Sequence, residues 1–327
     1  MQAWLLPQTG SIDSLRLDTL EVPPPGSGEV TLDVLYAALN PADRYLAEGL
    51  YPARPKFPHI LGRDAVGVIS KVGAGVSDWK VGDKALLLRG EAGVSRPGTL
   101  AQQVTVPAEC LESIPTGWTD QEAACAALVY VTAYQALTQF GSLNESVVLV
   151  SGASGGVGVA AIQLACAMGH TVIALSRSSE KGSKLKELGA TWTFNPEDVD
   201  WPATLKQLLQ PRRVDLVVDN IGGALLPKLI DTLGMNGRVS LVGMLAGAVP
   251  QFNTASLFFR RLQMRGVAVG SYTLDENRQA WRQVVAMLSG TQQKPLIDSI
   301  FPMQDVPSAF ARLAEGPLGK VLVAINT

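Results

Sequence analysis

The chain has 327 residues, of which 47% are hydrophobic, and a formal net charge of −2. This length predicts two domains, and a near-neutral chain without a long Lys/Arg run argues against nucleic acid as a partner. No apolar run reaches the ~20 residues of a membrane span, and the N-terminal MQAWLLPQTG lacks the pattern of a signal peptide, so we expect a cytoplasmic protein without a membrane partner.

The first hundred residues are divided by Gly- and Pro-rich stretches such as VPPPGSGEV and KVGAGVSDWKVGDK. Between them lie short runs rich in β-branched residues, which predict strands over Val30–Leu39, Ala65–Val72 and Ala85–Leu88. Many short strands separated by turns are typical of a compact, mostly β domain of the barrel or sandwich kind. We place this domain at residues 1–119.

From about Thr119 the sequence changes to an alternation of strands and helices. A helix is predicted to begin with Thr119 or Asp120 as its N-cap and to run through DQEAACAALVYVTAYQAL. The strands that follow are apolar without alternation, which is typical of a buried parallel sheet, so residues 120–265 are predicted to form a doubly wound α/β domain. The predicted strands are Val147–Val150, Thr171–Leu175, Val214–Val218 and Val239–Val242, and the predicted helices are Val157–Met168, Glu180–Leu188 and Leu225–Leu233.

The last part of the chain, residues 266–327, is too short for a third domain and is predicted to rejoin the first one. Its predicted helices are Glu276–Leu288 and Pro307–Leu313, and its predicted strands are Ile297–Phe301 and Lys320–Ile325. No internal repeat or low-complexity segment interrupts this order.

A glycine-rich turn joins the first strand of the α/β domain to its helix. Residues 153–158 read A-x-G-x-x-G, which departs from the G-x-G-x-x-G fingerprint at its first position, with Gly152 just before it. Such a turn leaves the first amides of the helix free to bind a pyrophosphate, which is typical of Rossmann dinucleotide sites; the alternative is a turn chosen for packing alone. The residues expected to contact the dinucleotide are Ser154, Gly155, Gly156 and Val157.

The second strand of this domain ends in ALSRSSEK, where NAD sites usually carry Asp or Glu for the ribose 2′-hydroxyl. A guanidinium and hydroxyls can hydrogen-bond a 2′-phosphate, which a carboxylate would repel. The predicted cofactor is therefore NADPH, although Arg177 could instead be a solvated loop charge. The residues predicted at the 2′-phosphate are Ser176, Arg177 and Lys181.

Five segments carry a resemblance to a known family: ALNPADRYLAEGLYP, PHILGRDAVGVISKVGAGVSDWKVGDKAL, GTLAQQVTVPAECLESIPTGWTDQEAACAALVYVTAYQAL, GASGGVGVAAIQLA and GKVLVAI. In this order and spacing the chain resembles, nearly end to end, the medium-chain dehydrogenase/reductase superfamily, in its zinc-independent NADPH:quinone oxidoreductase (zeta-crystallin-like) branch. The resemblance implies a GroES-like β domain formed by both chain ends, a Rossmann domain between them, an active site in the cleft and a homodimer.

Zinc-dependent members of this superfamily hold a catalytic metal with a Cys, a His-Glu pair and a further ligand. Asn40 stands at the first of these positions, and Arg63-Asp64 stands at the pair. The three cysteines have no metal-like spacing, so we expect them to be small buried side chains. His59 and Asp64 cannot complete a tetrahedral set, and no metal is predicted.

Without a Lewis acid, a conjugated acceptor is the easier substrate, because hydride adds to its β-carbon and the charge spreads onto the carbonyl oxygen. Tyr51 matches the position of a proton-donating Tyr in related enoyl thioester reductases; the alternative is a Tyr that merely packs against the nicotinamide. Asn40 resembles an Asn of the family that lies near nicotinamide and substrate, and its amide could donate to the carbonyl. Tyr51 and Asn40 are the predicted catalytic residues.

Further cofactor contacts follow from the resemblance. They are Asn40, Thr132, Asn220, Val242, Gly243, Met244 and Lys320. Relatives often carry a Tyr after an Asn near the third Rossmann strand, but here Pro196 follows Asn195, which leaves that contact without a counterpart.

The leading hypothesis is an NADPH-dependent oxidoreductase that transfers hydride to a quinone, an enone or an enal. A second enzyme hypothesis is an enoyl thioester (acyl-CoA or ACP) reductase, which needs a channel for a pantetheine arm. A third, from another class, is a crystallin-type protein that binds the cofactor but acts by interaction. Tyr51, Asn40 and the glycine turn favour the enzymes.

Overall fold

The computed structural model describes residues 1–88 and 91–327. It divides into two compact units: unit 1 comprises Met1–Leu128, Leu274–Arg278 and Lys294–Thr327, and unit 2 comprises Val129–Thr273 and Gln279–Gln293. Relative to the predicted boundaries, residues 120–128 lie in unit 1, whereas 266–273 and 279–293 lie in unit 2. Helices α3 (Ala127–Thr138) and α9 (Leu274–Ser289) each run from one unit into the other.

Unit 1 is built around a seven-stranded sheet and a three-stranded one. The larger sheet has the order β15 (Ile297–Pro302), β16 (Lys320–Ala324), β3 (Glu29–Ala38), β5 (Asp64–Val72), β6 (Lys84–Leu87) and β8 (Leu111–Glu112), and β7 (Gln103–Pro107) also pairs with β3. The smaller one has the order β2 (Arg16–Thr19), β1 (Gln2–Leu6) and β4 (His59–Ile60). Only β15 and β16 are parallel neighbours among the described strands of unit 1.

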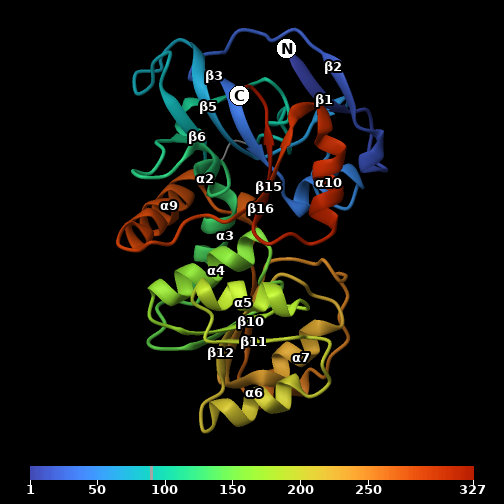
Figure 1. Cartoon of the computed structure of the whole chain (residues 1–327), viewed down its shortest axis with the longest axis vertical. Coiled ribbons are helices and arrows are strands. Elements are labelled where there is room, and N and C mark those ends of the chain that lie inside the picture. Colours follow the sequence, from blue (N-terminus) through green and yellow to red (C-terminus); the bar gives the residue numbers. More distant parts are fainter. Residues whose placement is uncertain (89–90) are drawn as a thin grey trace. The chain divides into compact units, whose positions relative to one another are not determined.

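Both ends of the chain build unit 1, as the labels N and C in Figure 1 show. The C-terminal strand β16 pairs antiparallel with β3, and the indole of Trp4 donates a hydrogen bond of 2.7 Å to the carbonyl of Met303. One apolar core joins the two segments, since Leu32 and Ile69 pack in the same buried cluster as Val323. The expected GroES-like, mostly β domain is confirmed.

The helices of unit 1 differ from prediction at one point. The single helix expected from Thr119 is divided into α2 (Asp120–Ala124) and α3, with a break at Cys125 and Ala126. Thr119 is the N-cap of α2, and its hydroxyl accepts from the amide of Glu122 at 3.2 Å, as the sequence predicts. The other helices of this unit are α1 (Pro41–Ala47) and α10 (Val306–Ala314).

Unit 2 is a six-stranded sheet in which every pairing is parallel. Its order is β11 (Trp192–Phe194), β10 (Thr171–Leu175), β9 (Val147–Val150), β12 (Val214–Asp219), β13 (Leu233–Leu241) and β14 (Gln263–Gly266). Helices α4 (Gly156–Ala167) and α5 (Ser179–Glu187) lie on one side of it, and α6 (Trp201–Leu209) and α7 (Leu225–Thr232) lie on the other (Figure 1). The Rossmann prediction is confirmed, and the strand order reverses between β9 and β12.

Several elements of unit 2 were not predicted. They are α6, β11, β14 and the short helix α8 (Ala255–Phe259). Cys110 and Cys125 are buried as expected, but Cys166 is exposed near the end of α4, so the expectation of three buried cysteines is wrong for one of them. None of the described helices combines the length and the apolar composition that crossing a membrane requires.

Candidate active site

The glycine turn of unit 2 has the geometry of a nucleotide cradle. Gly152 adopts φ +57°, so it, and not the Ala153 that the A-x-G-x-x-G pattern places first, makes the left-handed turn. A Cβ on Gly158 would lie 2.6 Å from the Cα of Ala153, which shows how closely helix α4 approaches the turn. Val159 donates the first bond of the helix ladder, to Gly155 at 2.9 Å. The amides of residues 156–158 precede that bond and form the helix N-terminus, where anions bind.

The ends of β9 and β12 are tied together at the reversal of strand order. The hydroxyl of Ser151 donates to the buried carboxylate of Asp219 at 2.6 Å, and the side-chain amide of Asn220 donates to the Ser151 carbonyl at 2.8 Å. Asp219 also accepts from the amides of Ile221 and Gly222. Ligands of doubly wound sheets bind beyond the carboxyl ends of the strands at such a reversal, so these bonds fix the floor of the candidate cofactor site.

The end of β10 carries the residues predicted for the 2′-phosphate. Ser176 and Ser178 are hydrogen-bonded to each other. Ser178 is the N-cap of α5, and its hydroxyl accepts from the amide of Lys181. Arg177 is exposed, and its nearest carboxylate is that of Glu197, at 3.9 Å. Exposed pairs at such a distance contribute little, so the guanidinium is available to a ligand. No sequence pattern singles out Glu197 as a neighbour of Arg177.

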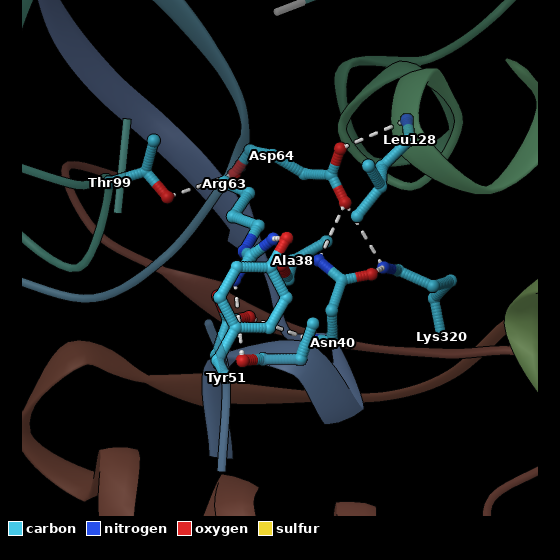
Figure 2. Close-up of polar contacts among 10 residues, drawn as sticks. Ala38, Asn40, Tyr51, Arg63, Asp64, Thr99, Leu128 and Lys320 are labelled. Atoms are coloured by element: carbon cyan, nitrogen blue, oxygen red, sulfur yellow. Dashed lines mark hydrogen bonds and ion pairs between the residues drawn. The ribbon is translucent and has the colours of Figure 1, made fainter. Parts of the chain in front are cut away.

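A buried polar network joins three segments of unit 1 (Figure 2). The ammonium of Lys320 donates to the side-chain oxygen of Asn40 at 2.6 Å and to Asp64 at 3.1 Å, while the amide nitrogen of Asn40 donates to Asp64 at 2.9 Å and to the Ala38 carbonyl at 3.3 Å. Asn40, Asp64 and Lys320 are each at most 4% exposed. Both amide hydrogens of Asn40 are therefore engaged within the protein, and this arrangement holds none of them toward a substrate carbonyl.

The same carboxylate organises its surroundings. The second oxygen of Asp64 accepts from the backbone amide of Leu128 at 3.2 Å, at the beginning of α3, and the hydroxyl of Thr99 donates to the Asp64 carbonyl at 3.1 Å. A carboxylate at a helix N-terminus satisfies one of its unpaired amides. This contact gives a physical reason for the break between α2 and α3.

A second cluster surrounds Tyr51. The guanidinium of Arg63 lies over the Tyr51 ring, 4.3 Å from its centroid, and donates to the phenol oxygen at 3.1 Å (Figure 2). Its Nε lies 3.4 Å from the fully buried carboxylate of Asp43. Burial raises the pKa of Asp43 above its ordinary value, and the charge of Arg63 opposes that shift. Asp43 also accepts from the backbone amide of Asn40 at 2.8 Å, at the start of α1.

The residues at the zinc positions of the superfamily do not fit a metal ion. The oxygens of Asn40 and Asp64 face the ammonium of Lys320, and Arg63 adds a second cation. Burial raises the pKa of the nearby Cys125 thiol, which disfavours the thiolate that a metal needs. Over residues 1–88 and 91–327, no group of three or more His, Cys, Asp or Glu side chains is placed to hold a metal.

The predicted site residues fall into two groups. Asn40, Tyr51 and Lys320 lie in unit 1, where Asn40 and Lys320 are in direct contact and Tyr51 contacts Arg63 instead. Thr132 is buried in α3 within unit 2. The remaining predicted residues follow the carboxyl ends of β9, β10, β12 and β13: Ser154, Gly155, Gly156, Val157, Ser176, Arg177, Lys181, Asn220, Val242, Gly243 and Met244.

Comparison with known proteins agrees with this architecture. Residues 26–116 match the family model of the alcohol dehydrogenase GroES-like domain, and residues 156–290 match that of the zinc-binding dehydrogenases. The fold and the nucleotide cradle thus define an oxidoreductase with a GroES-like and a Rossmann domain.

Two curated relatives specify the family. The chain is 34% identical to the rat synaptic vesicle membrane protein VAT-1 homolog, over 96% of this chain and 81% of the relative. It is 29% identical to human quinone oxidoreductase, over 95% and 93% of the two chains. The chain belongs to the medium-chain dehydrogenase/reductase superfamily, in its zinc-independent, quinone oxidoreductase-like branch.

Two solved structures show the same fold. One, described as an NAD-dependent alcohol dehydrogenase, has a TM-score of 0.91 and 28% identity and covers all of both chains. The other is a mycobacterial protein in complex with NADPH, with a TM-score of 0.89 and 25% identity over 99% of each chain. The two descriptions name different cofactors, so cofactor preference has to be argued from this chain's own residues.

Proposed function

We propose that this protein is a zinc-independent reductase that uses NADPH to reduce a quinone, an enone or an enal. The observation that carries the proposal is the end of β10, where Ser176 and Arg177 stand at the strand terminus and no carboxylate does. A carboxylate there would accept from the 2′-hydroxyl of NADH, whereas a guanidinium with hydroxyls suits the additional phosphate of NADPH. The mycobacterial neighbour holds NADPH but the other neighbour is described as NAD-dependent, so the proposal rests on Ser176 and Arg177.

The cofactor that the family implies fits the residues of unit 2. The amides at the start of α4 would bind the pyrophosphate, and Gly158 lets the helix approach the turn closely enough to present them. Arg177 and Ser176 would hold the 2′-phosphate. When bound, the reduced nicotinamide supplies hydride. The chain's remaining task is to position the acceptor and deliver a proton.

The polar groups of unit 1 support the proposed substrate class. The zinc positions hold an ammonium bound between Asn40 and Asp64, so a buried ion pair stands in the place of a Lewis acid. A conjugated carbonyl compound needs no stronger activation, because its own π-system spreads the charge that the hydride brings. Tyr51 is the proposed proton donor of unit 1, and its phenol oxygen accepts a hydrogen bond from Arg63. The quinone oxidoreductase relatives support this class.

Replacing Arg177 tests the cofactor assignment. Loss of a charge-assisted hydrogen bond costs roughly 1.4–2.8 kcal/mol, so Arg177→Ala should weaken NADPH binding roughly 10- to 100-fold and leave NADH binding within about twofold. Arg212→Ala is the control. This exposed arginine lies before the amino end of β12, whereas Arg177 follows the carboxyl end of β10. Titrations of cofactor fluorescence give both constants. Equal losses for the two cofactors would contradict the 2′-phosphate assignment.

The substrate is tested by following NADPH oxidation with quinones, enones, enals and acyl thioesters. Turnover of a quinone or an enone above background supports the proposal, and turnover of acyl thioesters alone would replace it with the thioester reductase. We also propose that the enzyme is a cytoplasmic homodimer, as the family resemblance implies. Light scattering on the purified protein measures the subunit number directly.

A further inference from the structure

The cluster around Tyr51 contains a residue to which the proposed function gives no role. Arg63 is only 9% exposed in its side chain and touches three partners in unit 1. Its Nη1 donates to the phenol oxygen of Tyr51 at 3.1 Å, its Nη2 donates to the Ala42 carbonyl at 3.4 Å, and its Nε faces Asp43 at 3.4 Å. Figure 2 shows the guanidinium stacked against the phenol ring.

We propose that Arg63 is the positioning residue for Tyr51: held by Asp43, it fixes the phenol ring and aims the hydroxyl hydrogen at the substrate. The inference rests on the proposed function and deepens it, because it assigns the residue that makes Tyr51 an effective proton donor.

The hydrogen bond between Arg63 and Tyr51 can run in one direction only. A guanidinium has five N–H donors and no acceptor, so the phenol oxygen accepts from Arg63. The hydroxyl hydrogen of Tyr51 therefore points away from Arg63 and is available to another acceptor. An ordinary phenol rotates its hydroxyl between several acceptors, and here one lone pair is already occupied.

The guanidinium of Arg63, lying over the Tyr51 ring, orients that ring. A planar guanidinium 4.3 Å from the ring centroid restricts the ring plane, and a lysine offers no equivalent flat face. Asp43, fully buried, keeps the guanidinium in place through its charge, and Asp43 is itself fixed by the backbone amide of Asn40. The position of the hydroxyl is therefore set by a chain of contacts from the α1 terminus.

The positive charge of Arg63 favours proton transfer from Tyr51. In the reaction, hydride forms a C–H bond at the β-carbon, and the π-electrons of the double bond move toward the carbonyl oxygen as an enolate. The O–H bond of Tyr51 then breaks as a C–H bond forms at the α-carbon, which leaves a phenolate that regains its proton from water. The Arg63 cation faces that phenolate oxygen directly and stabilises the charge formed in this step. Reduction of a quinone can take its proton from solvent and needs this step less.

The test is a double-mutant cycle on Arg63→Gln and Tyr51→Phe, measured with NADPH on an enone and on a quinone. Since general acid catalysis is typically worth 10²–10⁴-fold, we expect Arg63→Gln to lower kcat for the enone at least about tenfold, with KM changed less than about threefold. The solvent isotope effect on enone reduction should rise, because proton transfer becomes slower. In the Tyr51→Phe background the same change should cost less than about twofold, and quinone turnover should persist in every variant.

Two further variants complete the test. Arg54→Gln is the control, because this arginine is exposed three positions after Tyr51 and its loss changes the net charge equally. If Arg63→Gln does not fold because Asp43 is left unpaired, Arg63→Lys keeps the charge beside Asp43 but removes the flat face, and it should show a smaller loss that is still selective for the enone.

Equal losses on both substrates, or an undiminished loss in the Tyr51→Phe background, would show that Arg63 is only structural and would overturn this inference alone. No NADPH oxidation by the wild-type protein with either substrate would overturn the proposed function, and this inference with it.

Discussion

The buried contact between Lys320 and Asp64 leads to a stability prediction of defined size. The two side chains are 5% and 1% exposed, and Nζ lies 3.1 Å from the carboxylate. Lys320→Met keeps the length of the side chain but removes its charge. Asp64 then retains the donors of Asn40 and Leu128 but loses its cation. Removing one partner of a buried ion pair costs about 3–5 kcal/mol, because the other charge stays desolvated.

This cost corresponds to a large shift in melting temperature. For a folding unit of 150–250 residues, 1 kcal/mol lowers Tm by about 2–4 °C, so Lys320→Met should lower Tm by roughly 6 to 20 °C. Scanning calorimetry and urea unfolding followed by tryptophan fluorescence both measure the effect.

Two further variants show whether the stability loss comes from the burial of the ion pair or from loss of any ion pair. Lys84→Met breaks an ion pair with Asp120 that is shorter, at 2.7 Å, but half exposed at the lysine, and it should cost less than about 1 kcal/mol. Asp64→Asn combined with Lys320→Met leaves a neutral pair and should recover most of the lost stability. The reasoning is refuted if Lys320→Met stays within 1 kcal/mol of wild type, or if Lys84→Met costs as much.

Two other predictions concern the glycine turn and the C-terminal segment. Gly158→Ala places a Cβ 2.6 Å from the Ala153 backbone and should cost about 1–3 kcal/mol in urea unfolding, whereas Gly155→Ala, whose Cβ meets nothing closer than 3.5 Å, should cost far less; equal costs would contradict the close approach. Burial of Asp298 disfavours its charge, but the hydrogen bonds from Arg312 and neighbouring groups outweigh this and lower its pKa. That stabilisation exists above the unfolded pKa near 4 and is lost as pH falls through the folded value, so Arg312→Gln should cost on the order of 1 kcal/mol at pH 7, and progressively less below about pH 4. A difference independent of pH would contradict the assignment.

The sheet of unit 2 was predictable wherever its strands are buried on both faces. Strands β9 and β10 have the predicted bounds, because continuous apolar runs occur in short segments only when helices cover both sides. The edge strands β11 and β14 were missed since they carry no such run; in β14, QMRG, Met264 is the one apolar side chain. Edge strands take their conformation from the neighbour they pair with, and sequence patterns report that poorly.

The sequence signals on which the predicted cofactor site rests are local. Gly152, which makes the left-handed turn, stands directly before the A-x-G-x-x-G motif, so the sequence already places it beside the predicted pyrophosphate site. The buried network of Asn40, Asp64 and Lys320 could not be predicted from the sequence, because Lys320 lies 280 positions from Asn40 and 256 from Asp64. Only the pairing of β16 with β3 brings them together, and no local pattern encodes that pairing.

Arg63 and Asp64, adjacent in sequence, contact different neighbours, and each of the two buried charges has a counter-ion without a metal. Asp64 receives the ammonium of Lys320, so the carboxylate keeps a counter-ion. Arg63 pairs with Asp43 and donates to Tyr51, so the cation is paired as well. A divalent ion at this position would have to displace an ammonium and approach a guanidinium, which Coulomb repulsion disfavours at these distances. The two positive charges at this position thus belong to two side chains, Lys320 and Arg63, and Arg63 contacts Tyr51, the proposed proton donor.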